Sequence, residues 1–548
     1  MRLPKKIFFF LLIIEVLVNF SGIAVPFFSN DPALYAAIAK TMAQQNDFTN
    51  LYVYGIDWLD KPHFPFWMAA FSFKIFGISE WSYRLPALLF ILLGAFYTYR
   101  LARKIYNDDV AQIAVLVMLS SQHLIMSNTD VRAEPYLVGL IIAAVFHFYR
   151  LFQRFSFVDL LLGSLFAGCA VMTKGIFALV PVGCAIAGHA IFSKQLRHLF
   201  RWRWLWAILL TAVFVLPEVY TVYRQFDQHP EKNVFGRTGV SGVRWFLWDS
   251  QFSRFVMDGP IKRPKGDVFY YLHTLLWAFA PWCLIFYYVL ASKMVQAFKK
   301  RKLQEYVTVS AMLPMLLFFS LSKFQLNFYT NILFPFFSIL VASFIASFLS
   351  KKETKLYSIT QAVYSCLFVI GVIVLNILFQ PPYQWWYFFG ALFLLMCLYV
   401  VFKRVDSINL RWLMISILSV LYINLYLNLA VYPTMGALKG EYQAARFVNE
   451  FYPDQDLGVF NDTRHGFSFH SHQPVQRFDM DKWMSGSEKD RIFYVDAGAY
   501  GSLLSAKARF QIIREFNDYA SESISAKFIN VATRNQTLQT SYLVRAAP

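Results

Sequence analysis

The stretch SLSKFQLNFY, residues 320–329, places one lysine, Lys323, between two long apolar runs at about 305–321 and 325–348. Apolar runs of about 20 residues are long enough to cross a membrane as helices. A lysine at membrane depth is costly unless it meets a counter-ion, yet no acidic residue lies beside Lys323. The stretch therefore predicts a turn between two membrane-spanning helices, and a cation whose partner comes from elsewhere.

The composition indicates a membrane protein and argues against a nucleic-acid partner. Of the 548 residues, 57% are hydrophobic and 15% are charged, which is more apolar than a soluble core requires. The net charge of +18 arises from 51 Lys and Arg against 33 Asp and Glu, in short clusters between apolar runs. We interpret these clusters of cations first as signals of membrane topology. The five cysteines lie inside apolar runs without a CxxC pair, so neither disulfides nor a thiolate metal site is expected.

Thirteen apolar runs have spanning length, so we expect a polytopic α-helical membrane protein with about 13 transmembrane helices. The first run follows a basic leader, and we interpret it as a retained span rather than a cleaved signal. The runs cover about 7–27, 82–99, 110–127, 133–149, 157–172, 176–192, 204–223, 269–291, 305–321, 325–348, 357–379, 384–402 and 411–430.

The distribution of Lys and Arg predicts the orientation of these spans. Loops on the N-terminal side contain clusters such as 194–203, 293–302 and 351–355, and such an excess marks cytoplasmic loops. An odd number of spans then places the N-terminus in the cytoplasm and the C-terminus outside. We expect a multi-pass protein of the bacterial inner membrane, with its C-terminal end in the periplasm.

The chain is predicted to have two domains. A transmembrane domain covers 1–434, with long exterior loops at 28–81 and 224–268, and a polar tail covers 435–548. In the tail, ARFVNEFYPDQDLGVFND indicates a helix and then a strand, and DRIFYVDAGAYGSLLSAKARFQIIREF indicates strand, helix and strand. We expect a small α/β domain on the periplasmic side.

Cations in the short loops of the predicted outer face run against the usual bias. The short loops there contain Arg132, Lys174 and Lys323, and the first long exterior loop contains Lys61. Each alone fits snorkelling to the headgroups of membrane lipids. Together they favour a shared anionic ligand, for which the phosphate of a lipid fits, since its charge lies at headgroup depth.

Acidic side chains lie on the same face. Asp31 follows the first span and either caps a helix that begins at Pro32 or serves as a general base. Asp130 and Glu134 flank Arg132, four residues apart, which permits one helix face; the simpler alternative is a salt bridge to Arg132.

Several motifs, in this order, resemble the GT-C membrane glycosyltransferases of the bacterial aminoarabinose transferase and protein O-mannosyltransferase type. Residues 30–335 contain DPALYAAIAKTM with Asp31 and Tyr35, DKP with Asp60 and Lys61, then DVRAEPYL, MTKG, FSRF, YYLHTLLWAFAPW and LSKFQLNFYTNILFP. The 13 spans and exterior tail look like the aminoarabinose branch.

This resemblance implies a polyprenyl-phosphate-sugar-dependent glycosyltransferase, moving a hexose or pentose to a lipid A-like lipid or to a protein or glycan acceptor on the periplasmic face, with inversion. By the same resemblance Asp31 and Asp130 match catalytic acids. Positions near the carrier phosphate match Lys61, Tyr329 and Lys323, and the arginine of the second exterior loop matches Arg254. Tyr35, Asp60 and Glu134 are expected to support the site.

The chain departs from the aminoarabinose pattern at several positions. Pro32 follows Asp31 where that pattern has Glu, Asp60 replaces a Glu before Lys61, and Gln251 replaces a His. A metal held by that Glu and His is not predicted here. No cofactor is assigned, and a divalent metal stays open with no ligand residues named.

Two other functions fit a protein with many spans. A transporter or flippase of a lipid-linked sugar would show pseudo-repeated, broken helices with polar residues at mid-membrane, and no internal repeat is evident. A polysaccharide polymerase or ligase would share the carrier lipid and differ in its acceptor.

Overall fold

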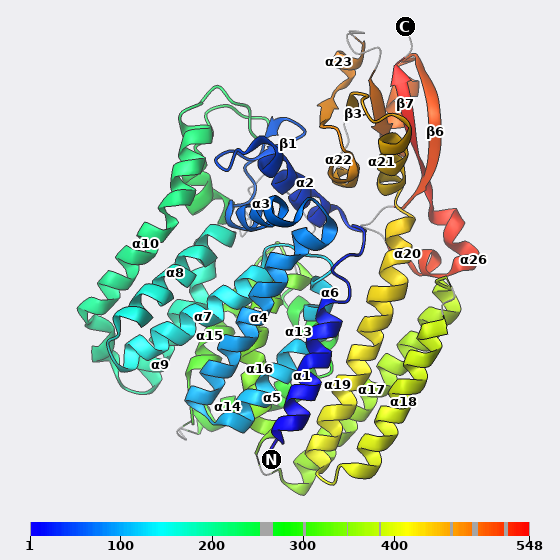
Figure 1. Cartoon of the computed structure of the whole chain (residues 1–548). Coiled ribbons are helices and arrows are strands. Elements are labelled where there is room, and N and C mark those ends of the chain that lie inside the picture. The colour runs from blue at the N-terminus through cyan, green and yellow to red at the C-terminus, as the bar shows by residue number, and fades with distance from the viewer. Residues whose placement is uncertain are drawn as a thin grey trace.

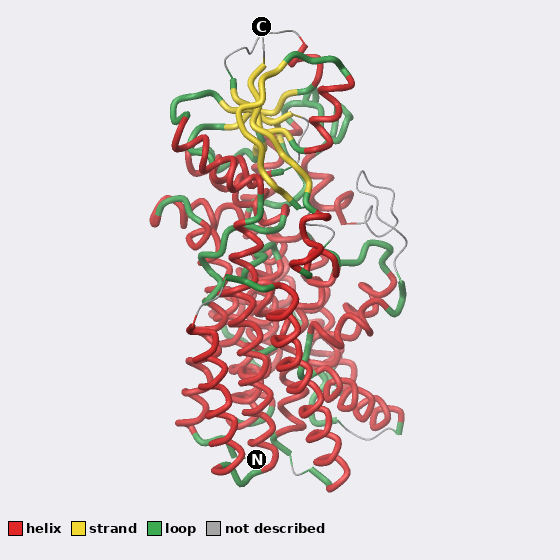
Figure 2. Tube along the Cα trace, turned by 90° about the vertical axis from the view of Figure 1, so that its right-hand side faces the viewer, coloured by secondary structure: helices red, strands yellow, loops and turns green. Residues whose placement is uncertain are grey.

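The computed structural model describes residues 2–251, 267–299, 303–347, 349–382, 385–460, 464–484, 491–519 and 524–546. A helical body carries a β-sheet domain at one end, and the two chain ends lie at opposite ends of the molecule (Figure 1). Figure 2 shows the strands of that domain gathered above the helices, at the end that holds the C-terminus. This arrangement agrees with an odd number of crossings; which end faces the cytoplasm stays a prediction.

The helical body consists of the following α-helices: α1 (Lys5–Phe20), α2 (Asn30–Gln45), α3 (Phe64–Phe76), α4 (Glu80–Ile105), α5 (Asp108–Leu119), α6 (Gln122–Ser127), α7 (Glu134–Gln153), α8 (Phe157–Lys174), α9 (Leu179–Phe192), α10 (Trp202–Val222), α11 (Gly242–Arg244), α13 (Tyr270–Ala278), α14 (Cys283–Phe298), α15 (Val307–Leu321), α16 (Phe334–Ile345), α17 (Lys351–Phe379), α18 (Trp385–Arg404), α19 (Ile408–Tyr426) and α20 (Tyr432–Ala437). Short 3₁₀-helices connect some of them, including the seven-residue η5 (Asn327–Leu333), which leads into α16.

Each of the thirteen predicted spans coincides with helix, which confirms the polytopic helical fold class. Within the described residues, seven helical segments are long and apolar enough to cross a membrane. Four shorter apolar helices accompany them: Phe64–Phe76, Ile176–Phe192, Cys283–Phe298 and Val307–Leu321. The most enclosed long span is α7, with 94% of its apolar window buried, whereas α17 has 22% buried and lies at the periphery. The predicted span at 269–291 is two helices, α13 and α14.

Two long spans begin with side chains that satisfy their first backbone groups. Before α4, the Ser79 hydroxyl accepts a hydrogen bond from the Ser82 N–H at 3.3 Å, and the Ser82 hydroxyl accepts one from the Ser79 N–H at 3.1 Å. Ser350 and Glu353 form the same reciprocal pair at the start of α17. Because the first N–H groups of a helix have no partner within it, these capping boxes define where the two spans begin.

The segment 28–81, predicted as the first exterior loop, folds into α2, a short hairpin and α3. Strands β1 (Tyr52–Val53) and β2 (Ile56–Asp57) pair antiparallel. Tyr54 and Gly55 connect them with positive φ of 54° and 78°, the geometry that tight hairpin turns require. The predicted cap at α2 is wrong in detail: the helix begins at Asn30, Ser29 holds the cap position, and Asp31 lies in the first turn.

The C-terminal domain is α/β, as predicted, with five strands in the order β4-β3-β5-β7-β6. Strand β3 runs parallel to β4 and β5, whereas β7 is antiparallel to β5 and β6. Its elements are α21 (Gly440–Phe451), β3 (Leu457–Phe460), α22 (His465–His470), β4 (Val475–Phe478), α23 (Met480–Met484), β5 (Ile492–Val495), α24 (Ala497–Ser505), β6 (Phe510–Asp518), α25 (Ala526–Ile529), α26 (Val531–Arg534) and β7 (Gln539–Ala546). The predicted boundary after residue 434 lies within α20 and stays a prediction.

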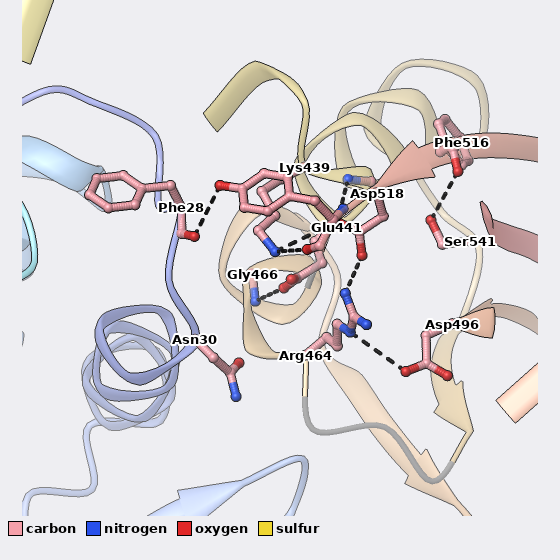
Figure 3. A network of polar contacts seen from close by, with 12 residues as sticks. Phe28, Asn30, Lys439, Glu441, Arg464, Gly466, Asp496, Phe516, Asp518 and Ser541 are labelled. Carbon is pink, nitrogen blue, oxygen red and sulfur yellow. Dashed lines mark hydrogen bonds and ion pairs between the residues drawn. The ribbon is translucent and has the colours of Figure 1, made fainter. Parts of the chain in front are cut away.

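Polar contacts join the C-terminal domain to the segment that follows α1. Figure 3 shows the domain side of this interface, where Arg464 pairs with Asp518 and, at 3.5 Å, with Asp496. The Gly466 N–H donates to Glu441 at 2.6 Å, and the His465 N–H donates to the Asn30 side chain at 3.3 Å. The bonds of Arg464 and Gly466 lie within the C-terminal domain, and the bond from His465 to Asn30 joins α22 to α2, the helix that carries Asp31.

Candidate functional site

A polar cavity of about 160 Å³, here the central chamber, gathers most of the predicted site residues. Its walls come from α2, the segment before α3, α7, α8 and the turn before α16. It is lined by Asp31, Leu34, Tyr35, Asp60, Lys61, Arg132, Ala133, Glu134, Lys174, Phe324, Leu326, Phe328 and Tyr329. Residues separated by up to about 300 positions therefore meet in one cavity of the helical body.

Helix ends deliver three of the charged side chains. Asp31 lies in the first turn of α2, Glu134 is the first residue of α7, and Lys174 is the last residue of α8. Carboxylates are favoured at helix N-termini and cations at C-termini, because the peptide dipoles are aligned. Gly175 then ends α8 with a φ of 89°, which glycine adopts at low cost.

Arg132 bridges the two predicted catalytic acids. Its guanidinium pairs with Asp31 on one side and with Asp130 at 3.1 Å on the other. The guanidinium also lies 4.3 Å from the centre of the Phe328 ring, and the Ser29 hydroxyl donates to Asp130. Although burial lowers the pKa of Arg132, the adjacent carboxylates outweigh it and raise the pKa above its usual value. The salt-bridge alternative for Asp130 is thus correct.

A single helix face for Asp130 and Glu134 is wrong, since α7 begins at Glu134 and Asp130 lies in the segment before it. Glu134, only 3% exposed, pairs instead with Lys174. The Lys174 ammonium lies 3.8 Å from the centre of the Tyr329 ring. Lys61 pairs with Asp60, its neighbour in the chain. The cations of the central chamber are therefore held in place by carboxylates.

Tyr35 closes the chamber from α2. It is buried, with its ring 5.4 Å from Phe66 and edge-on to it. Burial first, and then the charges of Asp31, Asp60 and Glu134, raise the pKa of Tyr35 well above its usual value. Its hydroxyl therefore stays protonated at neutral pH and can donate a hydrogen bond.

Two predicted phosphate-binding residues are not brought to this chamber. Lys323 is exposed and does not line it, although its neighbour Phe324 does. Arg254 lies outside the described residues.

A second cavity, here the apolar chamber, adjoins the central chamber. It measures about 90 Å³ and shares Asp60, Lys61, Lys174, Phe324 and Tyr329 with the central chamber. The rest of its wall is mostly apolar and comes largely from α15 and the segment around η1 (Ile176–Ala178). The junction of the two chambers thus combines two lysines with an apolar extension.

His63 and Glu218 form a buried pair that sequence reasoning did not assign. The His63 ring nitrogen Nδ1 lies 3.0 Å from Glu218 Oε1, and the His63 N–H donates to Glu218 Oε2 at 2.8 Å. This pair anchors the segment after Lys61 to α10, and it accounts for an acidic residue inside an apolar run. Within the described residues, no group of three His, Cys, Asp or Glu side chains is arranged to hold a metal ion.

Comparisons with known proteins show similarity in sequence and in fold. A family model described as dolichyl-phosphate-mannose-protein mannosyltransferase matches residues 60–220. The undecaprenyl phosphate-alpha-4-amino-4-deoxy-L-arabinose arabinosyl transferase of Shewanella sediminis is 26% identical over 366 residues, which are 65% of this chain and 63% of that protein. The enzyme of that name from Pseudomonas aeruginosa is 26% identical over 308 residues, 55% of this chain and 52% of its own. The chain thus matches less than two thirds of the length of these relatives.

Solved structures give the fold. The crystal structure of ArnT from Cupriavidus metallidurans bound to undecaprenyl phosphate has a TM-score of 0.77 at 15% identity, covering 99% of this chain and 98% of that chain. Its apo form has a TM-score of 0.76 at 16% identity. The chain therefore has the GT-C fold of ArnT, and its resemblance to the aminoarabinose transferase and protein mannosyltransferase family is confirmed.

Proposed function

We propose that this protein is a glycosyltransferase that moves a sugar from a polyprenyl-phosphate donor to a lipid acceptor, with inversion at the anomeric carbon. One observation carries the proposal: Lys61, Lys174 and Arg132 line a chamber with Asp31, and that chamber opens onto an apolar one. The names of the curated relatives, which are undecaprenyl-phosphate-sugar transferases, support the same substrate class.

The donor phosphate fits the junction of the central and apolar chambers. Lys61 and Lys174 line both, so a phosphate between them would leave its prenyl chain against the apolar wall. When the bond from the anomeric carbon to the phosphate oxygen breaks, the leaving polyprenyl monophosphate gains negative charge. Fixed cations then stabilise the transition state more than the bound donor, which lowers the barrier.

Asp31 has the position of a general base. Its side chain is 47% exposed and lines the central chamber, where an acceptor hydroxyl could reach it. Removal of the proton during attack on the sugar face opposite the leaving phosphate would give inversion. Asp130 acts through Arg132, which joins both acids. No step in this scheme uses a metal.

The surroundings of the reaction follow from the same proposal. The acceptor is lipid A-like, the enzyme crosses the inner membrane many times, and its chambers and C-terminal domain face the periplasm. The Lys and Arg clusters in the loops on the N-terminal side, at 194–203, 293–302 and 351–355, support this orientation. Mass spectrometry of lipid A and of glycoproteins, with and without the gene, separates a lipid acceptor from a protein acceptor.

The test of the proposed function is Asp31→Asn in membranes supplied with the lipid-linked sugar. Loss of the base should lower transfer by about 10²–10⁴-fold, measured as labelled acceptor. Asp454→Asn, at an exposed turn of the C-terminal domain, is the matched control and should keep wild-type activity. Full activity of Asp31→Asn would overturn the assignment. A transporter would instead move the donor intact, without release of polyprenyl phosphate.

A further inference from the structure

A third cavity, here the side chamber, lies beyond Arg132. It measures about 170 Å³ and shares Arg132, Glu134 and Phe328 with the central chamber. The remainder of its wall differs in origin, because it includes residues of α6, α13 and α20. His123 and Trp277 lie inside apolar runs, and Trp277 also belongs to the motif YYLHTLLWAFAPW, but the sequence alone assigned a role to neither residue.

Arg132 and Phe328 form the partition between these two chambers. Asp31 lines the central chamber and Asp130 lines the side chamber, and each pairs with the same guanidinium. A group bound in the side chamber therefore lies one side chain away from the proposed base. This placement suits the second substrate of a transfer reaction.

His123 supplies a buried hydrogen-bond acceptor to the side chamber. The residue is 6% exposed, and its Nδ1 lies 2.8 Å from Asn331 Oδ1. The Asn331 amide is oriented by its own Nδ2, which donates to the Ser127 hydroxyl at 3.2 Å. In the neutral ring Nδ1 therefore carries the hydrogen, and Nε2 presents its lone pair. Within the described part of the chain, no hydrogen bond to Nε2 is found.

Aromatic side chains provide the apolar part of the wall. Trp277 lies edge-on to His123, with ring centres 5.1 Å apart, and is 40% exposed. Phe28 and Tyr432 stack 4.7 Å apart and also line the side chamber. Apolar faces combined with a few fixed polar groups are typical of small-ligand sites.

We infer that the side chamber binds a sugar ring of the acceptor, and this inference rests on the proposed function. Asp130, Glu134 and His123 Nε2 accept hydrogen bonds, so their ligand must donate them, as ring hydroxyls do. The ring faces of the sugar would contact Trp277. A phosphate is disfavoured, because the one cation among the described lining residues, Arg132, already pairs with two carboxylates, and Glu134 adds a further negative charge. The acceptor therefore enters with its hydroxyls, not its phosphate, in this chamber.

The test compares substitutions that separate the two nitrogens of His123. In His123→Asn the amide can still donate to Asn331 but no longer reaches the position of Nε2, whereas the longer amide of His123→Gln can restore an acceptor there. Trp277→Ala removes the ring face, and Trp206→Ala, a tryptophan on α10 that is 57% exposed and lines none of the three chambers, is the control.

Transfer is measured in proteoliposomes with lipid A as acceptor and a polyprenyl-phosphate sugar as donor. His123→Asn and Trp277→Ala should each raise the KM for lipid A about tenfold, the effect of one hydrogen bond or ring contact. The KM for the donor should change less than about twofold, and His123→Gln should recover part of the loss. An unchanged KM for lipid A, or an equal rise in the donor KM, would overturn the inference.

Two further measurements distinguish a sugar site from a phosphate site, and failure of this inference from failure of the proposed function. Binding of dephosphorylated lipid A should be weakened by His123→Asn as much as binding of lipid A, and weakening confined to the phosphorylated form would identify a phosphate site and overturn the sugar assignment. Binding of undecaprenyl phosphate alone is measured on every variant. If the wild-type protein does not bind it, the proposed function fails; if all variants bind it and acceptor KM values are unchanged, only the side chamber is wrong.

Discussion

At the scale of single residues, the pairing of each cation with a carboxylate explains how charges persist at membrane depth. Lys174 pairs with Glu134, Lys61 with Asp60, and Arg132 with Asp31. An isolated buried charge would be strongly unfavourable. The pairs also hold the cations close to where the proposed phosphate arrives, so little reorganisation is needed when the donor binds.

The two lysines of the predicted phosphate site should behave differently. Lys174 lines both the central and the apolar chamber, whereas Lys323 is exposed and lines neither. Lys174→Met removes a charge-assisted contact of about 1.5–3 kcal/mol, which should raise the donor KM or lower kcat by about 10- to 100-fold. Lys323→Met should stay within about threefold of wild type.

Steady-state transfer with varied donor measures both variants. Equal losses in Lys174→Met and Lys323→Met would show that the turn at 320–329 reaches the phosphate when the donor is bound, and would restore Lys323 to the site.

At the scale of elements, α2 links the central chamber to the C-terminal domain. Its N-terminal turn carries Asp31, and its C-terminal half carries Lys40, which is buried under α22. The Lys40 ammonium donates to the backbone carbonyls of Ser468 at 2.9 Å, Phe469 at 3.2 Å and Ser471 at 2.5 Å. These carbonyls belong to the last turn of α22 and the residues beside it, where a helix leaves carbonyls unpaired. Lys40 is thus a C-terminal cap supplied by another domain.

Removal of this cap should loosen the contact between α2 and α22. Lys40→Met leaves carbonyls buried without a donor, at a cost of about 1–3 kcal/mol. Amide hydrogen exchange in peptides covering 30–45 and 465–471 should then accelerate by about 10- to 100-fold. Lys40→Arg keeps donors and serves as the matched control. Unchanged protection in Lys40→Met would show that apolar packing alone holds the two helices together.

At the scale of the whole molecule, the C-terminal domain docks through buried histidines. Burial lowers the pKa of His465 to about 3, with Arg477 nearby, and lowers the pKa of His470 to about 3. Around His470, Lys40 and Arg84 oppose a further positive charge, while the Glu80 carboxylate at 3.7 Å favours one. Burial and the two cations outweigh Glu80, so His470 is neutral in the docked state.

Docking should therefore weaken in acid. The ordinary histidine pKa is about 6.5, so between about pH 6.5 and 3 the undocked state binds more protons than the docked one. Stability then falls as pH falls, by up to about 1.4 kcal/mol per pH unit for each histidine. Hydrogen exchange in the peptide 464–471, corrected for intrinsic rates, should show less protection at pH 5.5 than at pH 7.5.

Replacement of His470 by Gln should reduce this pH dependence. The remaining histidine, His465, should still make docking weaker at lower pH. Equal protection at both pH values would mean that the domain stays docked after the histidines take up protons.

The sequence by itself determined the class of the protein. Apolar runs of spanning length and clusters of Lys and Arg predict a polytopic helical membrane protein, because both signals are local and follow from the bilayer thickness and the cost of charge in it. The alternation of helical and strand patterns after residue 435 predicts the α/β domain, because hydrophobic periodicity is also a local signal. Asp31, Lys61, Arg132 and Lys174 were recognisable because they lie close to span ends or in short motifs on the predicted outer face.

Only the tertiary structure decided which of these residues meet. The spacing of Asp130 and Glu134 allowed one helix face, but the start of α7 at Glu134 separates them. Lys323, the one cation in the stretch 320–329, is exposed. The lysine that contacts the Tyr329 ring is instead Lys174, from a distant span. His123 carried no signal and Trp277 only its place in the motif YYLHTLLWAFAPW, since a polar or aromatic side chain in an apolar run is recognisable as part of a site only when its neighbours from other helices are known. Membrane insertion is decided locally along the chain, whereas a chamber is formed by side chains from distant segments, and the chain pattern does not contain those distances.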